Sequence, residues 1–158
     1  MAHMTRLRIL AVGKLQKSFM IEAAEYYRKK ILRWHHLDER CIKDADSALP
    51  NNQRIAYESK ALLATLTSDD IAVCMDERGD LMTSMQFAEF FDGLLHTSSK
   101  TPCFIIGGPF GFDDTLRSKA RHLISLSPMT LPHEMARVML LEQIYRAETI
   151  IRHIPYHH

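Results

Sequence analysis

Residues Cys103–Phe112 read CFIIGGPFGF, a short apolar run that breaks into a turn with three glycines. A second apolar run, Leu123–Leu126, breaks into the turn SPMTLPH at 127–133. An apolar helix is expected next, and the chain ends in PYHH at 155–158. Two glycine- and proline-rich turns at strand ends indicate a ligand site made largely of backbone atoms. Because the Rossmann fold places its glycine turn after the first strand, this late position indicates a different fold.

Apolar runs with the character of strands alternate with helical patterns along the whole chain. Besides the two runs above, strands are expected at Leu7–Val12, Leu37–Ile42 and Ile71–Met75. Helices are expected over 20–34, from Asn51 or Asn52 to Leu66, over Thr83–Leu95, from Asp113 to near His122, and over Met135–Ile151. This alternation predicts one α/β domain over 4–158, a parallel-sheet three-layer sandwich with helices on both faces. Residues 1–3 are expected to be a remnant of an expression vector.

Three predicted turns fall at the carboxyl ends of strands, where α/β sheets bind ligands. They are the glycine turn after Ile106, the turn after Leu126 and the acidic turn Asp76–Gly79 after Met75. The glycine turn is neither GxGxxG nor a P-loop, so its spacing fits an ordinary turn equally well. The turn at 127–132 can present backbone groups to an adenine edge, or its apolar side chains can simply plug the core.

The overall composition is that of an ordinary globular protein, with a formal net charge of +1 that does not by itself indicate nucleic-acid binding. Basic residues gathered at 14–33 can bind phosphates locally or form a solvated helix face. No apolar run approaches the ~20 residues of a membrane span, and no secretory signal opens the chain. The cysteines Cys41, Cys74 and Cys103 are expected to be buried, reduced thiols of a cytoplasmic protein. No metal site is expected, because the three cysteines are far apart and form no CxxC pair.

The predicted helix Met135–Ile151 is apolar nearly all round its axis. A helix on the outside of a sheet needs only one apolar stripe. The surplus favours a second buried face, which the same helix of a twofold mate would cover, and so predicts a homodimer. The alternative is a central helix that other parts of the same chain cover.

Six short motifs resemble the ribosomal RNA large subunit methyltransferase H family, one of the SPOUT methyltransferases. They are Ala11–Lys14, Ile106–Pro109 with Gly111, Leu126–His133, Arg137-Val138, Glu142–Ala147 and Tyr156-His157. Each is short, but together they run through the region 4–158 and agree with the family in length and element order. The resemblance implies the SPOUT (alpha-beta knot) fold, whose C-terminal part forms a trefoil knot.

The resemblance also implies an activity. The family transfers a methyl group from S-adenosyl-L-methionine to N3 of a pseudouridine in large-subunit (23S) ribosomal RNA. The expected protein is a cytoplasmic homodimer whose substrate is ribosomal RNA in the assembled ribosome, with no metal and no membrane partner. Two alternatives stay open: a non-catalytic RNA- or ribosome-binding protein of the same fold, and a knotted enzyme that methylates ribose 2′-OH groups of transfer RNA.

Cofactor-binding positions carry over from the family onto the three turns described above. They are Met75, Gly107, Leu126, Ser127, Pro128, Met129, Thr130 and Leu131. Because a sulfonium methyl group is already activated, the protein mainly has to align nucleophile, methyl and sulfur.

Four further residues are the candidate catalytic groups. His133 is the candidate acceptor of the N3 proton, with a cap at the helix start as its alternative. Arg137 is the candidate positive charge that favours the anion, with an ion pair on its own helix as its alternative. Tyr156 and His157 form a tail that is expected to dock at the partner's site and stack on a base. Without the resemblance this tail would be interpreted as a frayed end.

Overall fold

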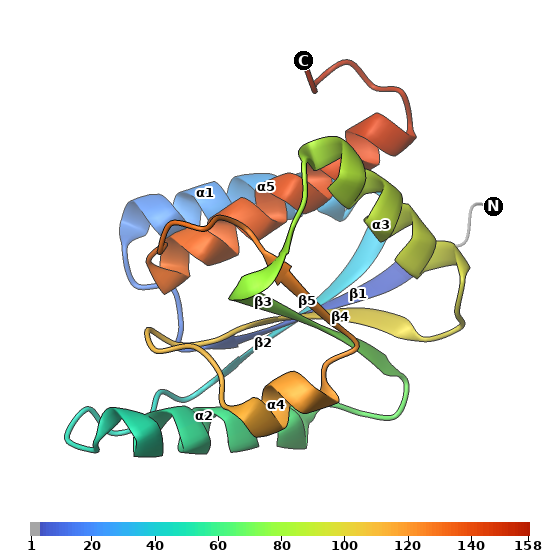
Figure 1. Cartoon of the computed structure of the whole chain (residues 1–158). Helices are drawn as coiled ribbons and strands as arrows, with labels where there is room; N and C mark the ends of the chain where they lie inside the picture. The colour runs from blue at the N-terminus through green and yellow to red at the C-terminus, as the bar shows by residue number, and fades with distance from the viewer. Residues whose placement is uncertain (1–3) are drawn as a thin grey trace.

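The computed structural model describes residues 4–158, so the predicted vector remnant at 1–3 lies outside the described residues. The elements in chain order are β1 (Thr5–Val12), α1 (Ser18–Ile31), β2 (His35–Ile42), α2 (Asn51–Thr65), β3 (Asp70–Leu81), α3 (Ser84–His96), β4 (Thr101–Ile106), α4 (Asp114–Lys119), β5 (His122–Ser125) and α5 (His133–Ile151). All strands pair in parallel, in the order β2-β1-β4-β3-β5. Helices α1, α3 and α5 cover one face and α2 and α4 the other, which confirms the predicted α/β sandwich (Figure 1).

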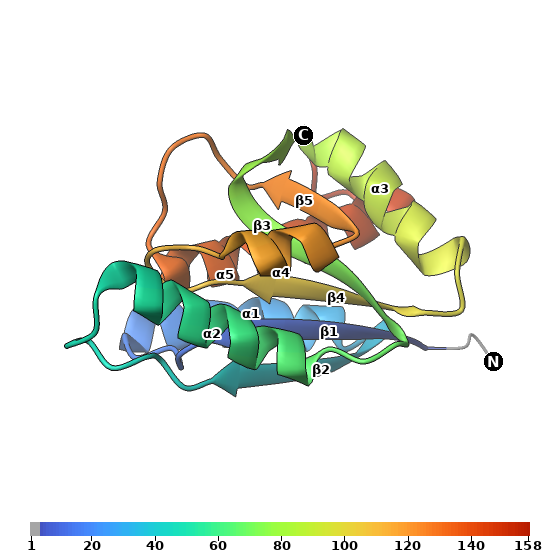
Figure 2. The same cartoon turned by 60° about the horizontal axis from the view of Figure 1, so that its bottom comes forward.

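The core lies on both faces of the central strands β1 and β4. Ile9 and Phe104 belong to the cluster under α1, α3 and α5, whereas Leu10 and Ile105 belong to the cluster under α2 and α4. All four side chains are fully buried. Figure 2 shows α2 and α4 side by side over the second face. The strands in the middle of the sheet therefore carry apolar side chains on both faces instead of alternating between apolar and polar residues, as expected for a parallel sheet with helices on both faces.

The third strand runs on to Leu81, so the prediction that the chain turns at Asp76–Gly79 is wrong. The strand passes through an irregularity in its pairing with β5 and then continues along it. Gly79 permits this passage, because a Cβ atom there would lie 2.5 Å from the backbone nitrogen of Ile124. The irregularity falls between Met75 and Asp80, so it includes residues 76–78.

Two predicted helix starts are confirmed by their hydrogen bonds. Thr83 and Gln86 form a reciprocal capping box at α3. Asp113 caps α4 by accepting a hydrogen bond from the backbone of Leu116 at 2.8 Å. Helix α2 begins at Asn51, one of its two predicted starts, although no side chain caps it. Helix α4 ends at Lys119, before the predicted end near His122, because the N–H of Arg121 already donates to Ala72 of β3.

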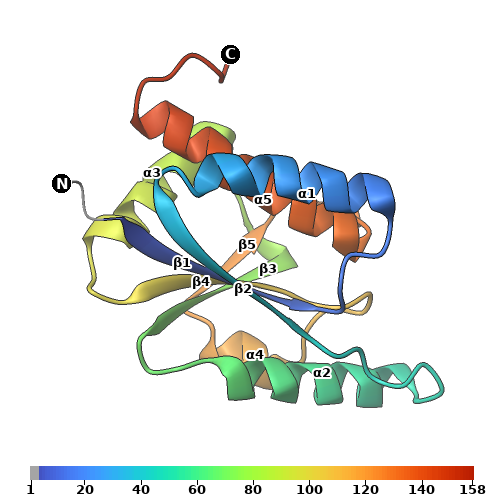
Figure 3. The same ribbon diagram turned by 180° about the vertical axis from the view of Figure 1, so that it is seen from behind.

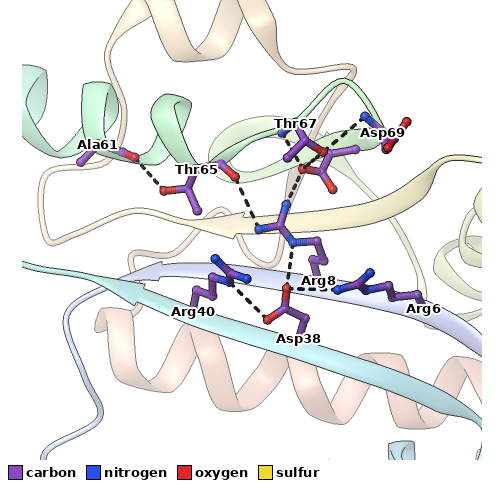
Figure 4. Close-up of polar contacts among 9 residues, drawn as sticks. Arg6, Arg8, Asp38, Arg40, Ala61, Thr65, Thr67 and Asp69 are labelled. Carbon is purple, nitrogen blue, oxygen red and sulfur yellow. Dashed lines mark hydrogen bonds and ion pairs between the residues drawn. The ribbon is translucent and has the colours of Figure 1, made fainter.

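An ion-pair network ties the amino end of the sheet together, at the edge opposite the rim where ligands are expected. Buried Arg8 of β1 lies between Asp38 of β2 and Asp70 at the start of β3 (Figure 4). Its Nε donates to Asp38 at 3.2 Å, and its guanidinium also reaches the carbonyl oxygen of Thr65 at 3.5 Å. A buried guanidinium needs such partners, because an unpaired charge in the interior is costly. The network joins three strands and the end of α2.

Helix α5 lies between α1 and α3 on one face of the sheet, and Figure 3 shows α1 crossing in front of it. Leu140, Leu141 and Ile144 are fully buried in the core of the same chain, whereas Met135 is 39% exposed. The chain itself therefore covers most of the apolar surplus, which was the alternative to the dimer. The trefoil knot stays a prediction. Among residues 4–158, no helix is long and apolar enough to cross a membrane.

Candidate functional site

The carboxyl ends of β3, β4 and β5 meet around an open pocket of about 400 Å³. Three segments contribute most of its lining: Met75–Arg78 of β3, the glycine turn Ile106–Phe112 and the loop around Leu126–Leu131. His133 and Ala136 close the pocket from the first turns of α5. The volume lies in the range of small-molecule sites. The prediction that three turns share one rim is therefore confirmed, although the first of them is part of a strand.

Nearly all of the predicted cofactor-binding residues line this pocket. They are Met75, Gly107, Leu126, Ser127, Met129, Thr130 and Leu131. Pro128 is not among the lining residues. Met129 is 76% exposed and stands at the mouth of the pocket. An exposed methionine beside a pocket is an adaptable apolar surface for a planar ligand.

The glycine turn is folded tightly upon itself. Gly108 and Gly111 form an isolated antiparallel bridge, and the N–H of Gly111 donates to the carbonyl of Gly108 at 3.1 Å. Gly111 has φ of +79°, a conformation that side chains disfavour. A Cβ atom at Gly107 would lie 3.2 Å from the carbonyl oxygen of Gly111 and 3.1 Å from the ring of Phe112. Glycine is therefore required at these positions by the turn itself, and the turn presents backbone to the pocket.

The loop after β5 is held by its own short hydrogen bonds. The Ser125 hydroxyl donates to the carbonyl of Ser127 at 2.9 Å, and the Ser127 hydroxyl accepts from the N–H of Met129 at 2.9 Å. Across the pocket mouth, the Thr130 hydroxyl lies 3.4 Å from a carboxylate oxygen of Glu77. These contacts shape the loop and leave its remaining backbone groups available to a ligand.

Charged residues of β3 are the part of the site that sequence reasoning missed. Asp76 is buried and pairs with Arg117 of α4 at 2.5 Å, while its second oxygen accepts from the N–H of Arg78 at 2.9 Å. Glu77 and Arg78 are exposed and line the pocket. The segment was expected to be a turn because it is polar and ends in glycine. In the sequence, only Gly79 hinted at a longer strand, because a glycine within a strand also allows two strands to approach closely.

The start of α5 places His133 in the pocket. The N-cap position is Pro132, and no side chain caps the helix, so the alternative role of His133 as a cap is not what the structure shows. The neighbouring Glu134 accepts hydrogen bonds from the backbone N–H groups of Gln16 at 2.5 Å and Lys17 at 3.2 Å. These hydrogen bonds lower the pKa of Glu134, so it stays ionised and fastens the helix start to the β1–α1 connection.

Arg137 does not line the pocket. It is buried, and its Nη1 donates to the sulfur of Cys41 at 3.1 Å, while its Nε has no hydrogen-bond partner among residues 4–158. Cys41 is exposed, so the expectation that every cysteine is buried is wrong there. Cys41 lies near the end of the edge strand β2, which has a neighbour on one side only. Burial raises the pKa of Cys74 and Cys103 to about 12, so both remain thiols at neutral pH.

The C-terminal tail packs on its own helix, away from the pocket. The Tyr156 hydroxyl donates to Glu142 at 2.9 Å, and its ring lies edge-on to Tyr145 at 4.8 Å between centroids. His157 Nδ1 lies 3.1 Å from Arg146, which also pairs with Glu142 at 2.6 Å. Burial and the contact with Glu142 raise the pKa of Tyr156. The tail is therefore ordered rather than frayed.

Within one chain the tail and the pocket are far apart. Glu142, which Tyr156 contacts, follows His133 by nine residues on α5. At 1.5 Å per residue, this contact lies roughly 14 Å along the helix from the pocket end. The structure therefore brings together His133 and the predicted cofactor residues, but not the two tail residues.

The chain is similar to methyltransferases over nearly its whole length. A family model described as "Predicted SPOUT methyltransferase" matches residues 5–157. The protein named ribosomal RNA large subunit methyltransferase H in Oleidesulfovibrio alaskensis is 48% identical over 155 residues, which are 98% of this chain and 100% of that protein. The protein of the same name in Nitratidesulfovibrio vulgaris strain DP4 is also 48% identical, over 98% of this chain and 99% of that protein.

Solved structures share the fold at much lower identity. A methylase family protein from Neisseria gonorrhoeae is 12% identical, with a TM-score of 0.54 over 98% of this chain and 96% of that one. A methylase family protein from Haemophilus influenzae is 11% identical, with a TM-score of 0.51 over 96% of this chain and 70% of that one. The sequence matches cover the three segments that build the pocket as well as both ends of α5. The chain belongs to the ribosomal RNA large subunit methyltransferase H family of SPOUT methyltransferases.

Proposed function

We propose that the protein transfers the methyl group of S-adenosylmethionine to N3 of a pseudouridine in large-subunit ribosomal RNA. One observation carries this proposal: three segments that lie within the match to the family model line one pocket at the carboxyl rim of the sheet. The curated relatives named above carry this family's name at 48% identity. A ribosomal substrate would place the protein in the cytoplasm.

The pocket residues fit S-adenosylmethionine. The tight glycine turn at Gly107 and Gly108 gives close access to backbone N–H and C=O groups, which can recognise an adenine edge. Apolar side chains from Met75 and Leu131 line the same pocket and can cover a ring. The exposed carboxylate of Glu77 suits ribose hydroxyls or the positive sulfonium. The bound cofactor would supply an activated methyl group.

The chain must remove the N3 proton of the target base and hold the resulting anion. His133 is in the pocket and is our proposed proton acceptor. Arg137 lies four residues further along α5, on the same side of the helix, and its Nε has no partner among the described residues. Its positive charge would favour the anion without direct contact, because Arg137 is buried and a charge acts more strongly where it is shielded from water.

A homodimer would complete the site. Tyr156 and His157 pack against a part of α5 that is too far from the pocket of their own chain. We therefore propose that they act at the pocket of a partner. The neighbouring helices α1 and α5 carry exposed Phe19, Tyr26 and Met135. Exposed apolar side chains of this size are common at interfaces between subunits. The proposed partners are thus a second copy of the chain and ribosomal RNA within the assembled ribosome.

The test is methyl transfer in vitro. Ribosomes from a strain that lacks this modification, protein-free ribosomal RNA and transfer RNA would each be incubated with the protein and tritiated S-adenosylmethionine. Nucleoside analysis should find the label as N3-methylpseudouridine from the large subunit, with ribosomes as the best substrate. Label on ribose 2′-OH groups of transfer RNA would support the other catalytic alternative. Cofactor binding without transfer to any of these substrates would support a non-catalytic RNA-binding role.

A further inference from the structure

Helix α2 supports the glycine turn from behind with polar side chains. The guanidinium of Arg54 lies over the ring of Phe110, 5.0 Å from its centroid. One turn further along the helix, Glu58 lies against Gly108. The hydroxyl of Ser59 accepts a hydrogen bond from the N–H of Asp113 at 3.0 Å. Three residues of one helix thus contact the chain near the start of the turn, in its middle and just after its end.

Glu58 is the central contact of the three. Glu58 is only 3% exposed, and one of its carboxyl oxygens accepts a hydrogen bond from the N–H of Ala45 at 3.2 Å. The other oxygen lies 2.6 Å from the position that a Cβ atom at Gly108 would occupy. Glu58 is therefore held by the β2–α2 connection and packs closely against the glycine turn, and it is one reason why residue 108 has no side chain.

A buried carboxyl group is unfavourable unless it has hydrogen-bond or charged partners. Burial raises the pKa of Glu58, while the hydrogen bond from Ala45 and the charge of Arg54 lower it. Further along α2, Leu62 does pack in the core beneath the helix. The buried polar side chains of α2, Glu58 and Ser59, lie instead where the helix passes the turn. That distribution indicates a role in shaping the pocket, because the turn contributes seven of the residues that line it, Ile106–Phe112.

We propose that Glu58 is a positioning residue for the cofactor. Its carboxyl group fixes the backbone of the glycine turn and so sets the affinity for S-adenosylmethionine, without contacting the reacting atoms. The inference rests on the proposed function, because it names the ligand of the same pocket. It adds a residue on α2, a helix that contributes nothing to the pocket lining, and it separates an effect on cofactor affinity from an effect on kcat. Loss of Glu58 should raise the Kd and KM for the cofactor but leave kcat at saturating cofactor almost unchanged.

The first experiment compares Glu58→Ala, Glu58→Gln and Lys60→Ala. Lys60 is an exposed residue of the same helix and serves as the matched control. Calorimetric titration with S-adenosylmethionine should show an affinity loss of ~10-fold for Glu58→Ala, because the turn loses the carboxyl group against which it packs. Glu58→Gln keeps the size and an acceptor oxygen, so it should restore binding to within ~3-fold of the wild type. Lys60→Ala should bind like the wild type.

The second experiment tests the contact itself through a double-mutant cycle. Gly108→Ala alone should weaken cofactor binding, because the new methyl group meets the carboxyl group of Glu58. In the Glu58→Ala background the same change no longer meets the carboxyl group and should cost little further affinity. If the two losses simply add, or if Glu58→Ala lowers kcat rather than affinity, the positioning role is wrong.

Control measurements keep these outcomes distinct. Thermal unfolding of each variant shows whether it is folded before titration. If Glu58→Ala does not fold, Glu58→Asp replaces it, since it keeps the acid but withdraws it from the turn, and the same loss of affinity is expected. A wild-type protein that does not bind S-adenosylmethionine would overturn the proposed function and this inference together. Wild-type binding with unchanged affinity in the variants would overturn only the inference.

Discussion

His35 Nε2 lies 2.5 Å from Glu148 Oε1 in the interior of the protein, and this contact joins the first residue of β2 to the last turns of α5. The other ring nitrogen of His35 contacts the hydroxyl of Thr5 at the start of β1. Glu148 also accepts from Arg152 at 2.7 Å, and the Arg152 guanidinium stacks over Trp34 at 5.0 Å. The point where the tail leaves α5 is thus fastened to the amino end of the sheet.

Glu148→Gln should lower stability and flatten its dependence on acid. Burial alone raises the pKa of Glu148, but hydrogen bonds from His35 and Arg152 outweigh it and hold the pKa below the ordinary 4.5. A group with a lowered pKa stabilises the fold above its ordinary pKa, and this contribution is lost as pH falls through the pKa of the folded state. The variant should lose about 1–3 kcal/mol at pH 7.

Urea unfolding at a series of pH values from 7 to 3.5 checks this prediction. The difference between wild type and Glu148→Gln should shrink as the pH falls below about 4.5, the ordinary pKa. Glu89→Gln, which changes an exposed carboxylate on α3, is the control and should follow the wild type. A constant difference across this range would show that Glu148 contributes through shape rather than charge.

Gly79→Ala should destabilise the sheet, because its Cβ atom would lie 2.5 Å from backbone atoms of Leu123 and Ile124 in β5. Backbone cannot move aside as a flexible side chain can, so we expect a loss of about 1–3 kcal/mol. Gly93→Ala is the matched control: a Cβ atom there meets nothing within 4 Å inside α3. Alanine is the better helix former and should stabilise by about 1 kcal/mol. Equal melting temperatures for the two variants would contradict the close approach.

These two glycines show what the sequence does and does not predict. The apolar runs and the helical spacing predict the element order and the layers, because burial on both faces leaves a clear pattern. The carboxyl rim follows from parallel strands, so the pocket is predicted as a region. The polar segment Asp76–Gly79 carries no such pattern. Its course depends on pairing with β5, some 45 residues later in the chain, and the residues around position 79 do not by themselves predict that pairing.

The same limit applies to the polar residues around the site. The roles of Glu58 and Arg117 depend on segments far away in the sequence, Gly108 and Asp76. Nothing within their own helices marks them. The tail is the opposite case: its residues were singled out by resemblance, yet its contacts with Glu142 and Arg146 could be found only in three dimensions.

Gly107→Val should abolish cofactor binding in a folded protein. Even a Cβ atom at this position would lie 3.1–3.2 Å from Phe112 and Gly111, so the branched side chain must push into the turn or into the pocket. Calorimetry with S-adenosylmethionine measures the effect, and we expect a loss of at least ~100-fold, or about 2.7 kcal/mol. Unchanged affinity in a folded variant would show that the cofactor binds elsewhere.

The oligomeric state is a prediction of its own. Light scattering coupled to gel filtration should give the mass of two chains, about twice 18.2 kDa, at micromolar concentration. The physical reason is that exposed apolar side chains on α1 and α5, including Phe19 and Met135, need a partner surface. A folded monomer that methylates ribosomes would refute both the dimer and the shared site.

Deleting Tyr156–His158 should leave the affinity for S-adenosylmethionine nearly intact and sharply reduce methyl transfer. The tail lies away from the pocket of its own chain, so its loss removes no cofactor contact there. Stacking of one base on an aromatic ring contributes about 1–3 kcal/mol, so its absence should mainly weaken the use of RNA. Calorimetry and tritiated methyl transfer to ribosomes measure the two effects separately. A truncated protein that works at the normal rate would make the tail dispensable.

Mixing two inactive variants decides whether the tail acts across the dimer. A chain with His133→Ala keeps its tail, and a chain without Tyr156–His158 keeps its histidine. If each pocket combines His133 of one chain with the tail of the other, the mixed dimer contains one complete site, and activity should return on mixing and exchange of subunits. A site built within a single chain has no complete copy in any mixed dimer, so activity would stay absent. Two copies of the same variant, mixed and exchanged in the same way, are the control and should remain inactive.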